Sequence, residues 1–171
     1  FRIPKADFAG FMISASHSDS PTFHIKENAQ LKGPEAYARI NTEGYGGMLC
    51  APWLDRPLTV AGRVLVKAGD AIETRLVYVD RDLLLIPNVA IHMNREANSG
   101  LKYDQKTDTI PLMGMGQEEG AFRSIVAEAA GCAPGDILGT DLYLCLRQKG
   151  VTWGAGNEFV SAPRLDDLQC A

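Results

Sequence analysis

One short segment of the chain places a histidine and a carboxylate at a spacing that suits a metal site. His17 and Asp19 lie in the sequence ASHSDSP, after the apolar run Phe11-Met12-Ile13, which is typical of the end of a buried strand. Neutral imidazole is a good zinc ligand, and a carboxylate close by orients the ring and raises its basicity. The same residues also suit a plain polar turn, so a zinc site here needs a partner from elsewhere in the chain.

The other end of the chain offers that partner. Asp166 follows an extended segment and stands next to Asp167. A carboxylate in this place could bridge two metal ions, and it could equally cap the N-terminus of a helix. His92 ends an apolar segment directly before a polar stretch, which suits either an element boundary or a site. The pair Glu118-Glu119 is better explained by the start of a helix, whose dipole favours acidic residues there, than by a catalytic carboxylate pair.

Composition narrows the class of protein. The chain has 171 residues, of which 46% are hydrophobic and 22% are charged, an ordinary balance for one globular domain or one domain with pieces of a second. The net charge of -4 gives no basic surface for nucleic acid, and no apolar run approaches the ~20 residues that cross a membrane. None of the four cysteines lies in a CxxC pair, which favours reduced thiols in a cytoplasm over disulfides or a cysteine-based zinc site.

Alternating apolar and polar residues predict strands through most of the chain. The clearest signal is a hairpin in which Leu58–Lys67 and Ile72–Val79 flank the turn Ala68-Gly69-Asp70. One helix is predicted over Glu118–Ala130, ended by Gly131, with its apolar face formed by Phe122, Ile125, Val126, Ala129 and Ala130. Further strands are predicted over Phe8–Ser14, Thr22–Lys26, Tyr37–Glu43, Thr109–Met115 and Ile137–Arg147. The fold class is therefore α+β and β-rich, with one prominent helix.

The connections carry their own signals. Gly44-Tyr45-Gly46-Gly47 permits positive φ and close backbone approach, and it is either a bend in a β structure or the wall of a pocket. His24, in an alternating stretch, is expected to be a half-exposed strand residue. The other expected features are a polar connection (Glu27–Glu35), salt-bridged corners (Asp55-Arg56 with Asp80-Arg81-Asp82), a long exposed loop (Asn94–Asp108) and a glycine-rich turn (Gly150–Gly156).

Six sequence motifs in order carry a resemblance to a known family. They are ASHSDSP, TEGYGG, WLDRPLTVAGRV, RLVYVDRDLLLIPNVAIHMNR, DILGTDLYL and EFVSAPRLDD. Together they resemble the aspartyl aminopeptidase (aminopeptidase I) family of cocatalytic zinc metallopeptidases. The chain lacks an initiator Met and stops shortly after the last motif, so we expect a segment of a longer polypeptide.

The resemblance implies a division of the chain. Residues 1–21 would end the first segment of an α/β catalytic domain, and residues 22–157 would form an inserted, β-barrel-like dimerisation domain. Residues 158–171 would return to the catalytic domain. The family commonly has Asn where Asp167 stands. The family's remaining zinc ligands and its general base would lie beyond Ala171, so this segment alone is expected to be inactive.

The resemblance also implies roles for four residues. His17 would ligate one zinc ion, Asp19 would orient that ligand as a catalytic residue, and Asp166 would bridge two zinc ions. His92 would reach into the active site of a neighbouring subunit, where it holds the substrate or the developing oxyanion. The implied parent is a homo-oligomer of dimers in a larger cage, a dodecamer. It would act in the cytoplasm on peptides with a free N-terminus and release an acidic residue.

A different class of function remains open from the residues alone. The β-rich middle of the chain would suit a stand-alone, non-enzymatic assembly module, built to join copies of itself. A ligand-binding β-barrel is also possible, and its candidate binding residues are the aromatic side chains of Tyr45, Trp53 and Trp153. The ligand-binding barrel predicts no convergence of His17 with Asp166, whereas the assembly module is compatible with the peptidase.

Overall fold

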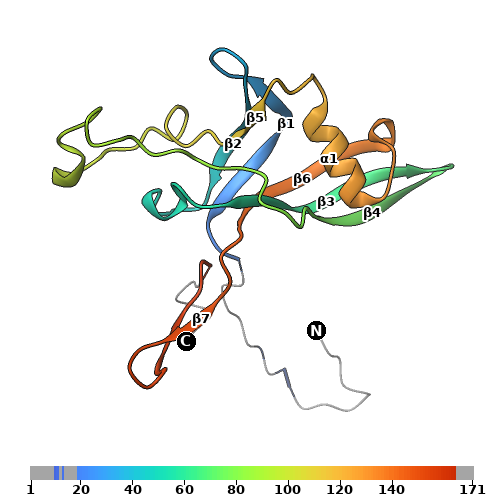
Figure 1. Cartoon of the computed structure of the whole chain (residues 1–171). Coiled ribbons are helices and arrows are strands. Elements are labelled where there is room, and N and C mark those ends of the chain that lie inside the picture. Colours follow the sequence, from blue (N-terminus) through green and yellow to red (C-terminus); the bar gives the residue numbers. More distant parts are fainter. Residues whose placement is uncertain (1–9, 12, 14–18, 165–171) are drawn as a thin grey trace.

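In the part of the chain that the structure describes, the main architecture is an open antiparallel sheet with a single α-helix on one face (Figure 1). The computed structural model describes residues 10, 11, 13 and 19–164. Six strands form the sheet in the order β4-β3-β6-β1-β2-β5. Their bounds are β1 Thr22–Lys32, β2 Tyr37–Tyr45, β3 Leu58–Ala68, β4 Ala71–Tyr78, β5 Leu112–Met115 and β6 Ile137–Leu146. The β-rich class with one helix is confirmed. Because β4 and β5 lie at opposite ends of the strand order, the expected barrel-like closure is not seen among the described residues.

The predicted hairpin is present as strands β3 and β4. Their register pairs Ala68 with Ala71, and Gly69 takes φ +62° in the tight turn between them. Val60, Val64 and Val66 are buried, as the alternation predicts. Thr59, which is out of step with these valines, is also fully buried, and its hydroxyl donates to the carbonyl of Val79.

Strand β1 extends beyond its predicted end. Residues 27–32 were predicted to be a polar connection, but they continue β1 and pair with β2, after a register shift between Ile25 and Gln30. Strand β6 pairs with β1 only at His24 and Ile25. Beyond Ile25, β2 is the only pairing partner of this strand among the described residues, so its side chains need not be apolar.

The helix α1, Ala121–Ala130, begins three residues later than predicted. Glu118 and Glu119 precede it, and its first turn is capped from β1: the amide oxygen of Gln30 accepts from the Phe122 N–H at 3.1 Å. At the other end Gly131 takes φ +66°, as a C-cap glycine should. The buried face consists of Phe122, Val126 and Ala127, whereas Ala129 of the predicted face is exposed.

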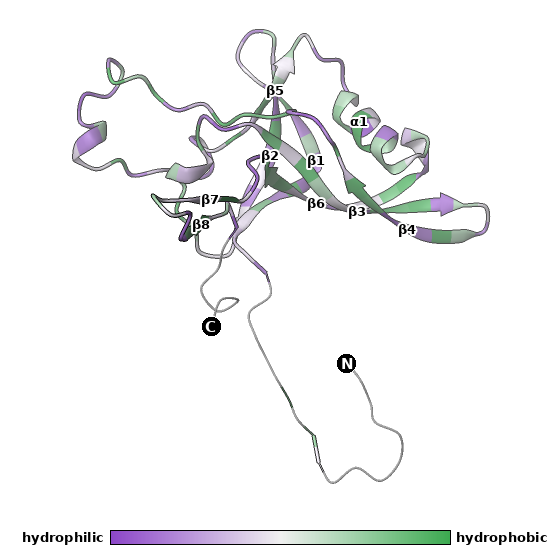
Figure 2. Ribbon diagram, turned by 60° about the horizontal axis from the view of Figure 1, so that its bottom comes forward, coloured by the Kyte–Doolittle hydropathy of each residue, from purple (hydrophilic) through white to green (hydrophobic). Residues whose placement is uncertain are grey.

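The core lies between the sheet and the segments that cover it. Its largest fully buried side chains are Phe23, Ile25, Ile40, Leu58, Ile86 and Leu142. Trp53, in the short 3₁₀ helix Ala51–Trp53, packs edge-on against Phe23 at 5.2 Å between ring centroids. Figure 2 shows apolar stretches, drawn in green, alternating with polar ones along the strands of the sheet. Among the described residues, no helix combines the length and the apolar character needed to cross a membrane.

Two segments project from this sheet. The long connection between β4 and β5 extends away from it as a loop with one short 3₁₀ helix, Ala97–Ser99 (Figure 1), which confirms the predicted long exposed loop. The predicted turn Gly150–Gly156 instead contains strand β7, Val151–Trp153, which pairs with β8, Phe159–Ser161, in a separate two-stranded sheet. Another short 3₁₀ helix, Pro134–Asp136, precedes β6.

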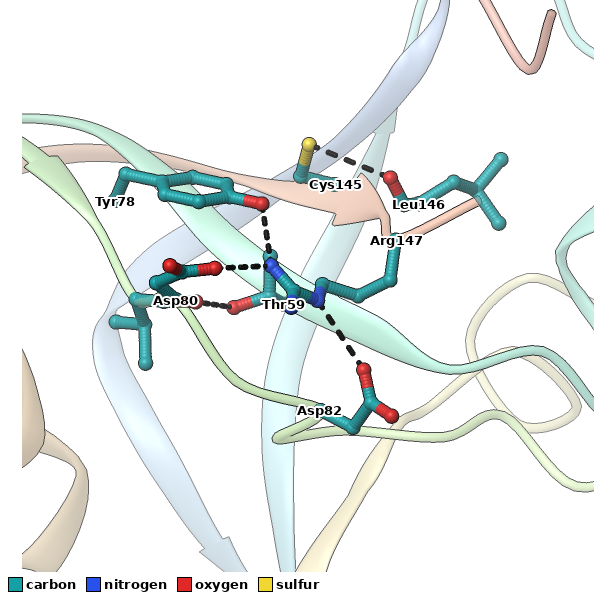
Figure 3. Close-up of polar contacts among 8 residues, drawn as sticks. Thr59, Tyr78, Asp80, Asp82, Cys145, Leu146 and Arg147 are labelled. Carbon is teal, nitrogen blue, oxygen red and sulfur yellow. Dashed lines mark hydrogen bonds and ion pairs between the residues drawn. The ribbon is translucent and has the colours of Figure 1, made fainter. Parts of the chain in front are cut away.

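The expected salt-bridged corner is built from a different arginine (Figure 3). Arg147, directly after β6, contacts Asp80 at 2.7 Å and Asp82 at 3.1 Å, and it also donates to the Tyr78 hydroxyl. These contacts raise the pKa of Arg147, and the hydrogen bond to Asp80 has the largest effect. Arg56, which was expected to pair at this corner, donates to the side chain of Gln148 at 2.8 Å. The corner therefore ties the end of β6 to the segment after β4.

Candidate functional site

Of the two residues that suggested a metal site in the ASHSDSP segment, His17 and Asp19, the structure describes Asp19. A tyrosine holds its carboxylate in place. The hydroxyl of Tyr45 donates to Oδ2 of Asp19 at 2.8 Å. Tyr45 is the last residue of β2 and pairs with Thr22, the first residue of β1. The hydrogen bond to Asp19, followed by the negative charge of that carboxylate, raises the pKa of Tyr45 above its usual 10.0. The hydroxyl is therefore neutral at physiological pH and acts as the donor.

The glycine-rich turn lies against the exit of the ASHSDSP segment. Gly46 takes φ +76°, and a Cβ built there would lie 3.6 Å from Cα and Cβ of Pro21. The hydroxyl of Thr22 donates to the carbonyl of Leu144 on β6 at 2.8 Å. The segment that leaves Asp19 is thus attached to both β2 and β6. The turn is a bend in the β structure, and its tyrosine reaches the candidate site.

A polar and aromatic cluster continues from Tyr45 across the same face of the sheet. The ring centroids of Tyr45 and Tyr143 lie 5.8 Å apart, and those of Tyr143 and His24 lie 4.9 Å apart. His24 lies between two carboxylates, with Nδ1 3.5 Å from Glu43 and Nε2 3.7 Å from Asp141. Its side chain is 30% exposed, which confirms the predicted half-exposed strand residue.

The two predicted metal ligands, His17 and Asp166, lie outside the described residues. Within residues 10, 11, 13 and 19–164, no group of three or more His, Cys, Asp or Glu side chains could hold a metal ion. The residue types nevertheless fit zinc, which takes imidazole nitrogen and carboxylate oxygen as ligands. A carboxylate held by a neutral hydroxyl, as Asp19 is, stays able to accept from an imidazole N–H.

His92 occupies the projecting loop between β4 and β5. It lies in a turn closed by the hydrogen bond from the Met93 N–H to the Ala90 carbonyl at 2.8 Å, and it is exposed. Its apolar neighbours are exposed as well: Val89 by 50%, Ile91 by 45% and Met93 by 82%. In Figure 1 this loop is the yellow-green segment that reaches away from the sheet. Exposed apolar side chains beside a histidine are typical of a contact surface.

Sequence reasoning did not assign Tyr45 to the metal site. The residue was named as part of the glycine-rich turn and as one of three aromatic candidates for a ligand-binding barrel, with Trp53 and Trp153. The structure buries Trp53 in the core and places Trp153 on the separate hairpin, against Phe159 at 4.8 Å. The available signal for Tyr45 was its position between two glycines, which allow the turn to approach its neighbour closely.

Comparison with known proteins identifies the family of this chain. A model of the aminopeptidase I zinc metalloprotease (M18) family matches residues 3–171. The chain belongs to this family, as the six motifs indicate.

Among the similar curated proteins, a probable M18 family aminopeptidase 2 of Clostridium acetobutylicum is 43% identical over 166 residues. That match covers 94% of this chain and 38% of the relative. The aspartyl aminopeptidase of Dictyostelium discoideum is 32% identical, and the match covers 93% of this chain and 40% of the relative. The chain therefore spans well under half the length of these curated relatives.

Solved structures share the fold. The crystal structure of prApe1 matches with a TM-score of 0.80 and 32% identity, covering 91% of this chain and 36% of that one. The mApe1 dodecamer of S. cerevisiae matches with a TM-score of 0.72 and 29% identity, covering 91% and 35%. Both matches run through nearly all of this chain and about a third of the other.

Proposed function

We propose that the chain is part of a zinc aminopeptidase that releases N-terminal, acidic residues from peptides. The observation that carries this proposal is the family match over residues 3–171. The acidic preference is supported by the name of the Dictyostelium relative, aspartyl aminopeptidase. The three free thiols among the described residues, Cys50, Cys132 and Cys145, suit a cytoplasmic protein.

Three residues would build the chain's share of the metal site. The imidazole of His17 and the carboxylate of Asp166 would hold zinc, with Asp166 shared between two ions. Asp19 would accept the second ring N–H of His17, which fixes the tautomer and the direction of the ligating nitrogen. Bound zinc supplies Lewis acidity and an activated water at neutral pH.

His92 would act across a subunit boundary. Its loop projects from the sheet and carries exposed apolar side chains, which an assembled partner would cover. From there the imidazole would donate a hydrogen bond to the substrate oxygen on which negative charge develops. The active site would then be complete only in the oligomer.

The proposed division of the chain assigns residues 1–21 and 158–171 to the catalytic domain and residues 22–157 to an inserted oligomerisation domain. The six-stranded sheet supports it, because β1 starts at Thr22 and β6 ends at Leu146. For the assembled state we propose a homo-oligomer of dimers, a dodecamer, as the solved S. cerevisiae relative is described.

The experiment uses the full-length protein that contains this chain. We expect it to purify with bound zinc and to release Asp or Glu from peptides with a free N-terminus, an activity that a chelator removes. Asp166→Asn should abolish that activity, whereas Asp167→Asn, the same change one residue later, should retain it. A stand-alone assembly module would show no zinc-dependent cleavage in either form. The proposal fails if the wild-type protein, loaded with zinc, cleaves no peptide.

A further inference from the structure

We propose that Tyr45 is a positioning residue for the zinc site, acting through Asp19 on the orientation of His17. The inference rests on the proposed function, because the role of Asp19 toward His17 belongs to that proposal. What the structure adds is the next link: the hydroxyl of Tyr45 donates to Asp19 at 2.8 Å.

Tyr45 is well placed to hold a carboxylate still. Its backbone is paired with Thr22, only three residues after Asp19. Its ring meets the ring of Tyr143 edge-on, at 72° between the ring planes. The turn that follows lies against Pro21, through Gly46. Asp19 and the tyrosine that binds it are thus attached to the same corner of the sheet.

The chemistry of the donor matters as much as its position. A tyrosine hydroxyl is neutral, so it fixes one carboxylate oxygen without placing a positive charge beside a metal ion. A carboxylate that accepts a hydrogen bond from a hydroxyl can also accept one from a ligating imidazole, and that second bond raises the basicity of the ring. A tyrosine has only two side-chain torsions, so ordering it costs less entropy than ordering a lysine. Tyr45 therefore suits the task of orienting Asp19.

The test is Tyr45→Phe in the full-length, zinc-loaded protein. This change removes one hydroxyl and keeps the ring that contacts Tyr143. We expect zinc to be lost to an excess of chelator about 10-fold faster, at the low end of the ~10–100-fold range for residues behind a metal ligand. We also expect kcat to fall while KM is retained. The matched control is Tyr37→Phe, the same change at the opposite end of β2, which should leave both measurements unchanged.

A double variant separates positioning from a general structural effect. If Tyr45 acts through Asp19, then adding Tyr45→Phe to Asp19→Asn should change the rate of zinc loss no further. Equal zinc retention in Tyr45→Phe and the wild type would overturn the inference, as would effects of the two substitutions that simply multiply. A wild-type protein that holds no zinc would overturn the proposed function itself, which is a different outcome from either of these.

Discussion

The histidines and tyrosines of this chain differ in what their neighbours allow them to do. His24 stands between Glu43 and Asp141 on the sheet, and it has no place in the proposed chemistry. His92 stands on a projecting loop among exposed apolar side chains. Tyr45 donates a hydrogen bond to Asp19. Tyr143, which contacts the ring of Tyr45, also packs at a tilt against the ring of His24. Residue type alone does not separate these roles, because each depends on which strand brings the next side chain close.

Tyr143 gives a prediction about pH. Burial raises the pKa of Tyr143 above its usual 10.0, the hydrogen bond and charge of Asp141 raise it further, and Arg63 lowers it. The folded state therefore keeps the phenol proton at a pH where the unfolded state has lost it. That stabilisation is fully present below pH 10 and is lost as the pH rises through the folded-state pKa.

The measurement compares urea unfolding of the wild type with Tyr143→Phe between pH 8 and pH 11. The free energy of unfolding should fall more steeply above pH 10 in the wild type, because only the wild type carries this phenol. Parallel curves for the two proteins would show that Tyr143 ionises equally well in the folded and unfolded states.

At the scale of secondary structure elements, Gly62 is the described glycine at which an added Cβ would come closest to a neighbouring atom. It takes φ +150° in β3, and a Cβ built there would lie 2.1 Å from the carbonyl oxygen of Asp141 on β6. Gly62→Ala should therefore lower the free energy of unfolding by about 2–3 kcal/mol through overpacking and backbone strain.

The matched control for Gly62 lies in the paired strand. A Cβ at Gly139 of β6 would meet only Leu65, at the ordinary contact distance of 3.8 Å. Gly139→Ala should change stability by less than about 1 kcal/mol, and replacing a strand glycine can even stabilise. Denaturant unfolding of both variants checks this, and equal losses would mean that the close approach at Gly62 does not limit the packing.

The elements could be predicted where one face of a strand or helix is buried. The β3–β4 hairpin was correct because Val60, Val64 and Val66 alternate toward the core. Residues 27–32 were missed because β6 leaves β1 after Ile25, and a strand without a neighbour on that side needs no apolar pattern. Strand β7 was missed because its exposed residues pair only with β8, and a glycine-rich sequence is not a strand signal. The cap that Gln30 provides to α1 joins positions 92 residues apart, and no local pattern records it.

The candidate site was partly predictable for a related reason. The residues proposed to supply its chemistry, His17, Asp19, His92 and Asp166, stand in motifs that the resemblance matched one by one. Tyr45 holds Asp19 in place, and its contact with Asp19 depends on the pairing of β1 with β2. Strand register is set by the packing of the whole sheet, so the sequence shows the residue without showing its partner.

At the scale of the whole molecule, the account predicts an active site shared between subunits. His92→Gln removes the histidine of the loop, and Asp166→Asn removes the carboxylate that is proposed to bridge the two zinc ions. Each full-length variant alone should be inactive. When the two are reassembled together, a His92→Gln subunit keeps its metal site and receives His92 from its partner. Random pairing in dimers would then restore about a quarter of the wild-type activity.

The control for this experiment is His24→Gln, the same substitution on the sheet, which should stay active. If His92 acts within its own subunit, the mixture of the two inactive variants should recover no activity, because each active site would still lack one of the two groups. Recovery therefore separates the two arrangements directly.

Zinc-edge anomalous diffraction from crystals of the full-length protein tests the proposed metal site most directly. We predict that zinc is bound by both His17 and Asp166, at about 2.0–2.2 Å from each ligating atom, with the carboxylate of Asp19 against the ring of His17. Zinc bound without either residue, or an imidazole of His17 remote from the carboxylate of Asp166, would contradict it.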